Sequence, residues 1–331
     1  WGINNLMVAT QNNEHYKSVV AEGAGRGVAM GYWINAGMQS SATLNVIADG
    51  HVSILTGSPD IGGSRASMAL MASEVLGIPF EQINPQVAAT DSVGHTDVTG
   101  GSRTTVATGQ AVIQAAEQCV AEMCRRAAVE WEVEPGVVAW SQGAAHYGDQ
   151  TLTFEELALR AGAMGGPLTF SSSLNSTSAA PAFGVHICDA EVDKETGRTT
   201  ITRYTAIQDA GKAIHPDYVE GQMQGGAVQG IGWALNEEYI YDDKARLQNT
   251  GFLDYRMPVA SDVPMIDTVI IEVPNPNHPY GVRGVGEPPL VSAPAAVANA
   301  VENAIGQTMS DLPLSPPKIL AALHAQAAGD D

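Results

Sequence analysis

One carboxylate, Glu287, stands at the centre of a loop whose neighbours leave it little freedom. The loop, residues 279–289, reads Pro-Tyr-Gly-Val-Arg-Gly-Val-Gly-Glu-Pro-Pro. Gly284 and Gly286 allow the backbone to turn and to approach an opposing group closely. Pro288 fixes the exit from the loop and disfavours helical dihedrals at the residue before it. We therefore predict a non-helical backbone at Glu287 and a side chain that points into a cavity, where it could act as a catalytic base.

Two glycine-rich turns, residues 60–63 and 99–105, each precede a predicted helix. Backbone N–H groups at a helix N-terminus carry partial positive charge and suit a phosphate or pyrophosphate. In the second turn Ser102 and Thr104 add hydroxyl donors, and Arg103 adds a permanent cation. Neither turn has the Gly-Lys-Ser/Thr ending of a P-loop, and neither follows a strand with the pattern GxGxxG. The turns therefore predict either an anion-binding cofactor site or tight packing turns.

Gln222 lies in a glycine-rich segment, residues 216–235, that is predicted to be helical. Interior glycines cost about 1 kcal/mol each relative to alanine, so another backbone or a ligand is expected to pack closely against this helix. A glutamine side chain offers both a donor and an acceptor to a heterocycle. The alternative is a polar side chain on an exposed face of the helix.

The composition describes a folded and strongly acidic chain. Of its 331 residues 44% are hydrophobic and 16% are charged, which argues against disorder, and the length suggests two domains or lobes. The formal net charge of −20 and the pI near 4.6 disfavour binding to nucleic acid or to an anionic membrane surface. No apolar run reaches the roughly 18 residues of a membrane span, and no secretory signal is recognised. We therefore expect a cytoplasmic protein without a membrane span.

Cysteine and histidine form no recognised metal motif. Cys119, Cys124 and Cys188 form no CxxC pair and are too few for the four thiolates of an iron–sulfur cluster. The eight histidines show neither HxxxH nor HExxH spacing, so a zinc site held by the protein is not expected. The cysteines are expected to be reduced, buried thiols.

Hydrophobic periodicity predicts an α+β fold with two mixed α/β lobes, in which hairpins and glycine-rich loops lead into helix N-termini. A hairpin is predicted over residues 41–57, and Ser64 could cap the helix that follows it. Residues 163–181 have the composition of a connector between the lobes. The other predicted elements are strands near 83–87, 183–191, 198–208 and 268–273, and helices near 64–76, 105–126, 216–235, 293–305 and 317–326.

Four segments together resemble the molybdenum hydroxylases of the xanthine dehydrogenase and aldehyde oxidase family. They are residues 57–63, 99–111, 221–230 and 284–289, which occur in the family's order, and the last carries the highly specific element GxGEPP. The likeness runs from about residue 25 to the C-terminus. It covers the second half of the family's molybdopterin-binding unit, as in split-subunit bacterial enzymes such as nicotinate dehydrogenase.

The resemblance implies a molybdopterin cofactor, in bacteria commonly the cytosine dinucleotide, whose dithiolene and not the protein holds the molybdenum. Glu287 matches the family's base, which takes a proton from a hydroxyl on the metal while hydride passes from the substrate to a sulfido ligand. Tyr32 and Trp33 match the region of an aromatic substrate clamp, although they could also pack beneath the first hairpin. The positions that match cofactor contacts are Asp60, Ile61, Gly62, Gly63, Gly101, Ser102, Arg103, Thr104, Gln222 and Gly286.

The chain departs from the family pattern in two ways. Many relatives carry Gly-Gln-Gly in the first loop, whereas this chain reads Ile61-Gly62-Gly63, so only backbone contacts carry over there. The first half of the molybdopterin-binding unit is also absent, as are the flavin and iron–sulfur modules. The resemblance therefore implies a larger molybdopterin-binding subunit, an iron–sulfur subunit with [2Fe-2S] clusters and a flavin subunit with FAD as partners.

On this reading the chain divides into three parts. Residues 1–40 are expected to form an N-terminal arm that contacts the partner subunit and could reach the substrate pocket. Residues 41–180 form the first molybdopterin-binding lobe, and residues 181–331 form the second lobe, which carries the catalytic Glu287.

The sequence favours a catalytic subunit that hydroxylates an N-heteroaromatic compound or an aldehyde with oxygen derived from water. A carbon monoxide dehydrogenase-like subunit is one alternative, but nothing in this chain supplies the copper-ligating cysteine of that enzyme. A non-catalytic scaffold subunit is another, but a scaffold has no use for a buried unpaired carboxylate at position 287.

Overall fold

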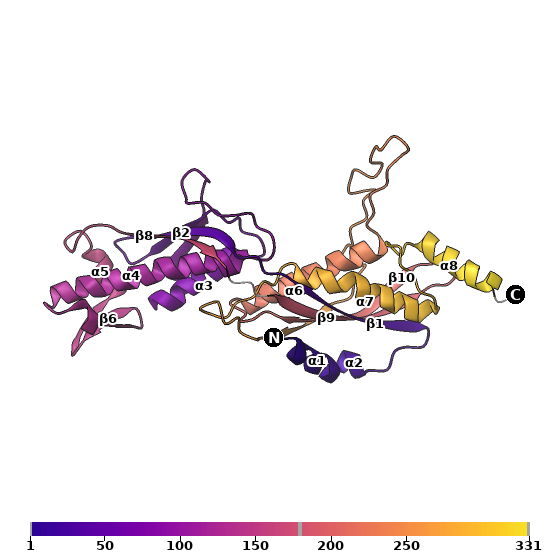
Figure 1. Ribbon diagram of the computed structural model, residues 1–331, viewed down its shortest axis with the longest axis horizontal. Coiled ribbons are helices and arrows are strands. Elements are labelled where there is room, and N and C mark those ends of the chain that lie inside the picture. Colours follow the sequence, from indigo (N-terminus) through magenta and orange to yellow (C-terminus); the bar gives the residue numbers. More distant parts are fainter. Residues whose placement is uncertain (1, 178–180, 330–331) are drawn as a thin grey trace.

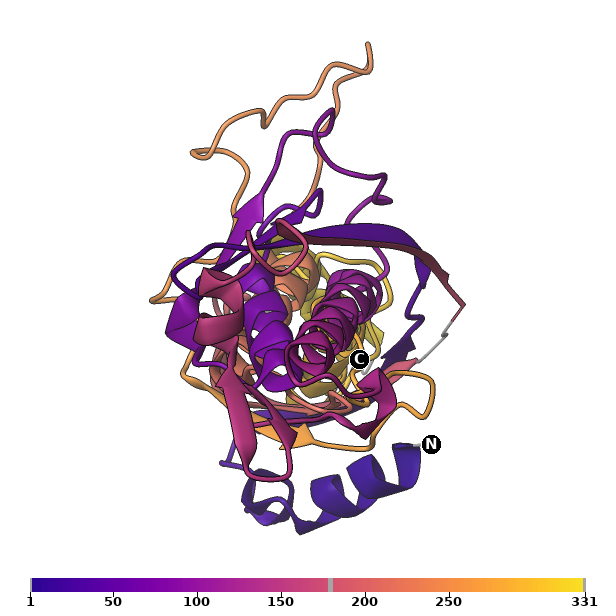
Figure 2. The same ribbon diagram turned by 90° about the vertical axis from the view of Figure 1, so that its left-hand side faces the viewer.

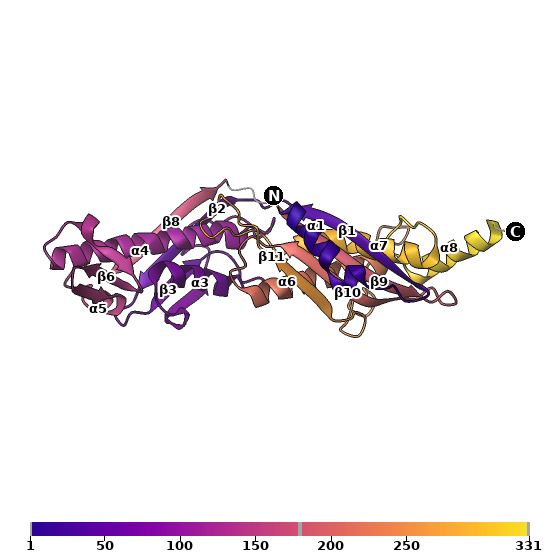
Figure 3. The same ribbon diagram turned by 90° about the horizontal axis from the view of Figure 1, so that it is seen from below.

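The computed structural model describes residues 2–177 and 181–329 and places them in two lobes along one long axis (Figures 1 and 3). Each lobe contains a four-stranded mixed sheet against which helices pack. The predicted α+β class is therefore confirmed.

The first lobe is built on a sheet with the strand order β4-β3-β2-β8. The hairpin predicted over residues 41–57 is present as β2 and β3, and two helices pack on the sheet to form the hydrophobic core of this lobe. A small sheet of order β5-β6-β7 lies beside the second of these helices. The elements are β2 (Met38–Val46), β3 (Val52–Thr56), α3 (Ser64–Leu76), β4 (Ile83–Val87), α4 (Gly109–Glu130), β5 (Ala139–Ser141), β6 (Ala144–Tyr147), β7 (Gln150–Thr153), α5 (Phe154–Leu159) and β8 (Leu168–Ser176).

The second lobe is built on a sheet with the strand order β1-β9-β10-β11. Because side chains alternate across a strand, β9 sends Ile187 into a small core under α1 and Cys188 into the larger core under α6 and α7. Within the described ranges, no helix combines the length and apolar character that crossing a bilayer requires. The elements are α1 (Ile3–Asn12), α2 (Glu14–Lys17), β1 (Ala24–Trp33), β9 (Ala182–Val192), β10 (Thr199–Asp209), α6 (Pro216–Leu235), β11 (Ile266–Ile271), α7 (Pro288–Ile305) and α8 (Pro316–Gly329).

The two lobes are not consecutive halves of the chain. β1 pairs antiparallel with β9, and Trp33 at the end of β1 lies opposite Ala182 at the start of β9. The first lobe is therefore an excursion that leaves the second lobe's sheet after Trp33 and returns to it at Ala182. Residues 24–33, which belong to the predicted N-terminal arm, form an edge strand of this sheet.

The helix that follows Glu287 lies directly on the backbone of β1. A Cβ atom on Gly27 would lie 1.9 Å from the carbonyl oxygen of Ala296 in α7, so only glycine allows this approach. Asn299 and Asn303 of α7 donate side-chain hydrogen bonds to the carbonyl oxygens of Val28 and Arg26. These contacts fix α7 on the sheet, and with it the residue at its N-terminus.

Two predictions of local structure are wrong. Residues 168–176 of the predicted connector form β8, in which Leu168, Phe170 and Leu174 share one face with Ser172 and can pack on the core. Residues 178–180 of the connector lie outside the described chain. Ser64 does not cap α3. The N-cap is Gly63, whose φ is 77°, while the Ser64 hydroxyl donates to the carbonyl oxygen of Pro59.

His186 in β9 is a fully buried titratable group. Its Nδ1 lies 2.8 Å from the hydroxyl of Tyr204 in β10. Burial lowers the pKa of His186 from 6.5 to about 3, since the uncharged imidazole is favoured away from water.

This histidine makes the stability of the fold depend on pH. Below about pH 6.5 the unfolded chain protonates this residue while the native state does not, so the free energy of unfolding should fall by roughly 1 kcal/mol between pH 6.5 and 5.5 from His186 alone. Urea unfolding of the wild type and of His186→Asn at both pH values measures this contribution. The exposed His51→Gln variant should keep the wild-type pH dependence, and a His186→Asn variant that also keeps it would contradict the assignment.

Candidate active site

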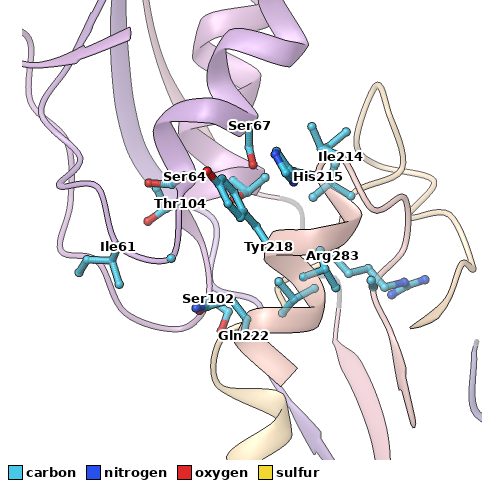
Figure 4. Close-up of a pocket in the computed structure, with 18 of the residues that line it drawn as sticks. Ile61, Ser64, Ser67, Ser102, Thr104, Ile214, His215, Tyr218, Gln222 and Arg283 are labelled. Carbon is cyan, nitrogen blue, oxygen red and sulfur yellow. The ribbon is translucent and has the colours of Figure 1, made fainter. Parts of the chain in front are cut away.

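A cavity of about 320 Å³ lies where the two lobes meet (Figure 4). The first lobe contributes residues of the turn 60–63, the start of α3 and the turn 99–105. The second lobe contributes the start of α6 and the loop 282–287. Each of the four segments singled out in the sequence therefore supplies residues to one cavity.

Glu287 lines this cavity, and its carboxylate is held by donors from two other parts of the chain. The Ser102 hydroxyl donates to Oε2 at 2.7 Å, and Nε1 of Trp33 donates to the same oxygen at 3.0 Å. The backbone N–H of Gly101 donates to Oε1 at a longer distance of 3.3 Å. The backbone N–H of Glu287 in turn donates to the Ser102 hydroxyl. The carboxylate is therefore fixed through one oxygen and more weakly contacted at the other.

The backbone of Glu287 is helical, so the prediction of a non-helical conformation is wrong. Its φ and ψ are −89° and −29°, and α7 begins at Pro288, several residues before the predicted start near 293. Prolines are tolerated in the first turn of a helix, where their missing N–H groups would have no partner in the helix. The side chain is directed by the hydrogen bonds from Ser102 and Trp33 and not by an extended backbone.

The turn beneath the carboxylate has an unusual backbone. Gly101 and Ser102 both have positive φ values, of 74° and 53°. Gly284 packs against this turn so closely that a Cβ atom on it would lie 2.5 Å from the Ser102 carbonyl oxygen. A serine in this conformation is uncommon, and it places the hydroxyl between the carboxylate and the backbone N–H of Glu287.

Gln222 of α6 lies between glycines of both lobes. A Cβ atom on Gly62 would lie 2.6 Å from the Gln222 amide, and one on Gly286 would lie 3.2 Å from its Oε1. The side chain lines the cavity, so the alternative of a surface-facing polar residue does not describe it. Its amide can offer a donor and an acceptor to a bound heterocycle.

Arg103 does not line the cavity, although the sequence suggested it as a cation for an anionic ligand. The side chain is fully buried and donates to the backbone carbonyls of Gly37, Gln39 and Asp97 and to the hydroxyl of Ser40. Its hydrogen bonds tie the turn 99–105 to the start of β2. The guanidinium therefore stabilises this turn and does not face the cavity.

The first turn supplies mostly backbone to the cavity. Gly62 lines it together with Ile61, whose side chain is 60% exposed. Gly63 is covered by Tyr218, because a Cβ atom on this glycine would lie 2.3 Å from the tyrosine ring. Asp60 pairs with Arg65 at 2.7 Å and accepts the backbone N–H of that residue. Its carboxylate is therefore engaged within the turn.

Tyr32 and Trp33, the two predicted substrate-pocket residues, have different surroundings. The ring of Tyr32 is 59% exposed and lies 6.0 Å from that of Phe183 in β9. Trp33 is partly buried and reaches Glu287 with its indole N–H. Of this pair, Trp33 is thus the residue in contact with the candidate base.

His215 and Tyr218 were not anticipated from the sequence. Their rings stack at the start of α6, with centroids 3.8 Å apart and planes inclined by 7°, and both line the cavity (Figure 4). Two aromatic side chains three residues apart at the start of a glycine-rich helix were the available signal. Within the described chain, three buried polar atoms of lining residues have no hydrogen-bond partner: Thr99 Oγ1, Thr104 Oγ1 and His215 Nδ1. Such atoms are suited to bind a ligand.

The charge of the cavity differs from that of the whole chain. Among its lining residues in the described chain, Glu287 is the one carboxylate, whereas Lys212 and Arg283 are cations. Arg283 is buried and pairs with Asp209 at 3.3 Å, and burial raises the pKa of that aspartate. In residues 2–177 and 181–329, no group of three or more His, Cys, Asp and Glu side chains could hold a metal ion.

Comparison with known proteins identifies the family. A family model described as a molybdopterin cofactor-binding domain matches residues 7–264. The putative xanthine dehydrogenase molybdenum-binding subunit of Escherichia coli is 31% identical over 300 residues, which cover 86% of this chain and 39% of that protein. The nicotine 6-hydroxylase large subunit of Paenarthrobacter nicotinovorans is 32% identical over 319 residues, which cover 92% of this chain and 39% of that protein.

Solved structures show the same relationship. Quinoline 2-oxidoreductase from Pseudomonas putida superposes with a TM-score of 0.82 at 26% identity, over 97% of this chain and 44% of that one. The chain thus spans less than half the length of the relatives it matches. Since the family model covers most of the chain, this protein belongs to the molybdenum hydroxylase family and carries its molybdopterin cofactor-binding domain.

Proposed function

We propose that this chain is the molybdopterin-binding catalytic subunit of a multi-subunit molybdenum hydroxylase. It hydroxylates an N-heteroaromatic compound or an aldehyde with oxygen derived from water, and Glu287 is the base. The observation that carries the proposal is the position of Glu287, the one carboxylate among the described lining residues of a cavity between the lobes. Relatives named for nicotine, quinoline and aldehyde as substrates support this substrate class.

The lining residues fit the groups that the cofactor would present. The Gln222 amide suits the donors and acceptors of a pterin ring, and the backbone of Gly62 lies beside it. The unpartnered hydroxyls of Thr99 and Thr104 suit phosphate oxygens. Lys212 also lines the cavity, but its ammonium group pairs with Glu272 at 3.2 Å. When bound, the molybdenum cofactor supplies the redox chemistry by accepting the two electrons that leave the substrate.

The hydrogen bonds of Glu287 decide which of its atoms can act as the base. Oε2 accepts hydrogen bonds from Ser102 and Trp33, so it fixes the orientation of the group. Oε1 has the longer contact with the Gly101 N–H and is the oxygen that we expect to accept a proton. Fixing one carboxylate oxygen in this way keeps the base in position without using both acceptors.

The remaining parts of the enzyme belong to other polypeptide segments. We propose that the pterin carries the cytosine dinucleotide, that a larger subunit completes the molybdopterin-binding unit, and that [2Fe-2S] clusters and FAD on further subunits carry electrons onward. A cytoplasmic complex is consistent with this assembly. The relatives' greater length supports the need for a complementary segment.

Glu287→Gln should abolish turnover while leaving the cofactor bound. The amide keeps the size of the side chain but removes the base, so we expect kcat to fall by at least about 100-fold. Molybdenum per complex, measured by mass spectrometry of the metal, should stay at the wild-type value. Glu302→Gln in α7 serves as the control and should keep its activity. A wild-type complex without molybdenum would indicate a scaffold, and one that oxidises carbon monoxide would favour the carbon monoxide dehydrogenase alternative.

Trp33→Phe separates a positioning role from a substrate contact. The variant keeps an aromatic ring but removes the hydrogen bond to the charged Glu287, so kcat should fall about tenfold with little change in KM. The control, Tyr32→Phe, removes only an exposed hydroxyl. A large rise in KM with an unchanged kcat would instead assign Trp33 to substrate binding.

Gly62→Ala should lower the content of bound cofactor. The added Cβ would lie 2.6 Å from the Gln222 amide and would displace it, and the φ of 64° adds backbone strain. Gly23→Ala is the matched control, because Gly23 has a φ of 78° and no atom within 4 Å of an added Cβ. Molybdenum and released pterin are measured in both complexes. Equal contents in the two variants would argue against a cofactor contact at Gly62.

A further inference from the structure

Residues 236–265, which link α6 to β11, form an arm that projects from the second lobe (Figures 1 and 2). Of these residues only Asn249 is buried. A connection of this length without helices or strands is uncommon in a compact domain and usually has a function. The arm is therefore a candidate interaction element.

The arm holds its shape through its own hydrogen bonds. Asn249 accepts the backbone N–H of Ile240 and donates to the carbonyl oxygen of Glu238. The backbone N–H of Gln248 donates to the carbonyl oxygen of Ile240, and Asp242 accepts the backbone N–H of Arg246. These bonds fold residues 238–249, the first part of the arm, back on themselves.

The arm exposes large apolar side chains along its length. Phe252 and Leu253 are 88% and 95% exposed, and Met265 and Val259 are 82% and 60% exposed. Large apolar side chains exposed on a projecting segment are typical of an interaction site.

The partner that would bind the arm is inferred from the length of the relatives and from charge. The family model matches residues 7–264, a range that contains the arm except for Met265. The relatives carry more than half of their length outside the part that this chain matches. A second copy of this chain is disfavoured, because two chains of net charge −20 repel each other. The arm itself carries six carboxylates and three cations, so its net negative charge instead suits a groove with a basic rim.

We propose that the 236–265 arm docks into an apolar groove, bordered by basic side chains, on the subunit that carries the rest of the molybdopterin-binding unit. This inference rests on the proposed function, because it requires that complementary subunit. Phe252 and Leu253 enter the groove and anchor the two subunits. The arm thereby joins the complementary chain to α6, the helix that carries Gln222 on the cavity.

The test uses the intact complex, purified through a tag on this chain. The double variant Phe252→Asp, Leu253→Asp should retain at least tenfold less of the larger subunit per tagged chain, measured by native mass spectrometry. The matched control is Val129→Asp, Leu159→Asp, which places the same charges at exposed sites of the first lobe, 66% and 71% exposed, and should retain the full complement. Thermal unfolding of the isolated chains should show unchanged stability, because the substituted side chains are exposed.

Hydrogen exchange gives a second, independent measurement. Amides of residues 250–254 should exchange at least tenfold more slowly in the complex than in the isolated chain. Unchanged exchange, or full retention of the larger subunit by the arm variant, would overturn the proposal. A dimer of the isolated chain that the arm variant abolishes would assign the arm to a second copy and would equally overturn it.

Molybdenum in the same wild-type complex separates this inference from the proposed function. A complex without molybdenum counts against the proposed function, whereas a molybdenum-loaded complex with an unprotected arm counts against the docking site alone.

Discussion

The hydrogen bonds that meet at Glu287 are the interaction on which the site depends. They join the end of β1, the turn 99–105 and the start of α7, which are far apart in the sequence. Trp33 is also the last residue of β1 before the chain leaves for the first lobe. The Glu287 carboxylate therefore connects the sheet of the second lobe with the turn 99–105 of the first lobe.

Glycines make this junction possible, because backbone and side chains approach there more closely than a Cβ atom would allow. Gly62 and Gly286 flank the Gln222 amide, and Gly284 lies against Ser102. Two of these contacts, that of Gly62 with Gln222 and that of Gly284 with Ser102, join segments from different lobes. The cavity is thus shaped by the absence of side chains at these positions as much as by the polar groups that line it.

The distribution of charge is a second constraint on the site. The chain carries a formal charge of −20, yet Glu287 is the one acidic side chain among the cavity's described lining residues. A second carboxylate nearby would repel both a phosphate-bearing cofactor and the charged form of the base. The excess negative charge of the chain therefore lies mainly outside the cavity's described lining residues.

Local patterns in the sequence determined much of the fold. Alternating apolar residues and turn residues located the first hairpin, the strands β9, β10 and β11 of the second sheet and the helix over residues 216–235. These local patterns gave wrong predictions where a strand forms by pairing with a segment far away in the sequence. Residues 168–176 have the serine-rich composition of a connector but form β8, because β2 supplies their hydrogen-bond partners. Residues 24–33 likewise form an edge strand because β9 pairs with them.

For the candidate site, too, some features follow from the sequence and others only from the tertiary structure. Residue type and spacing in the sequence predicted Glu287 and the two glycine-rich turns, and the resemblance to the family singled out Gln222; all of these segments supply residues to the cavity. Only the tertiary structure decided where each side chain points: Arg103 turns to backbone carbonyls behind its turn, and Trp33 turns to the carboxylate. The physical reason is that a hydrogen bond between residues 254 positions apart in the sequence, such as that from Trp33 to Glu287, forms only after β1 has joined the second sheet and α7 has packed on it.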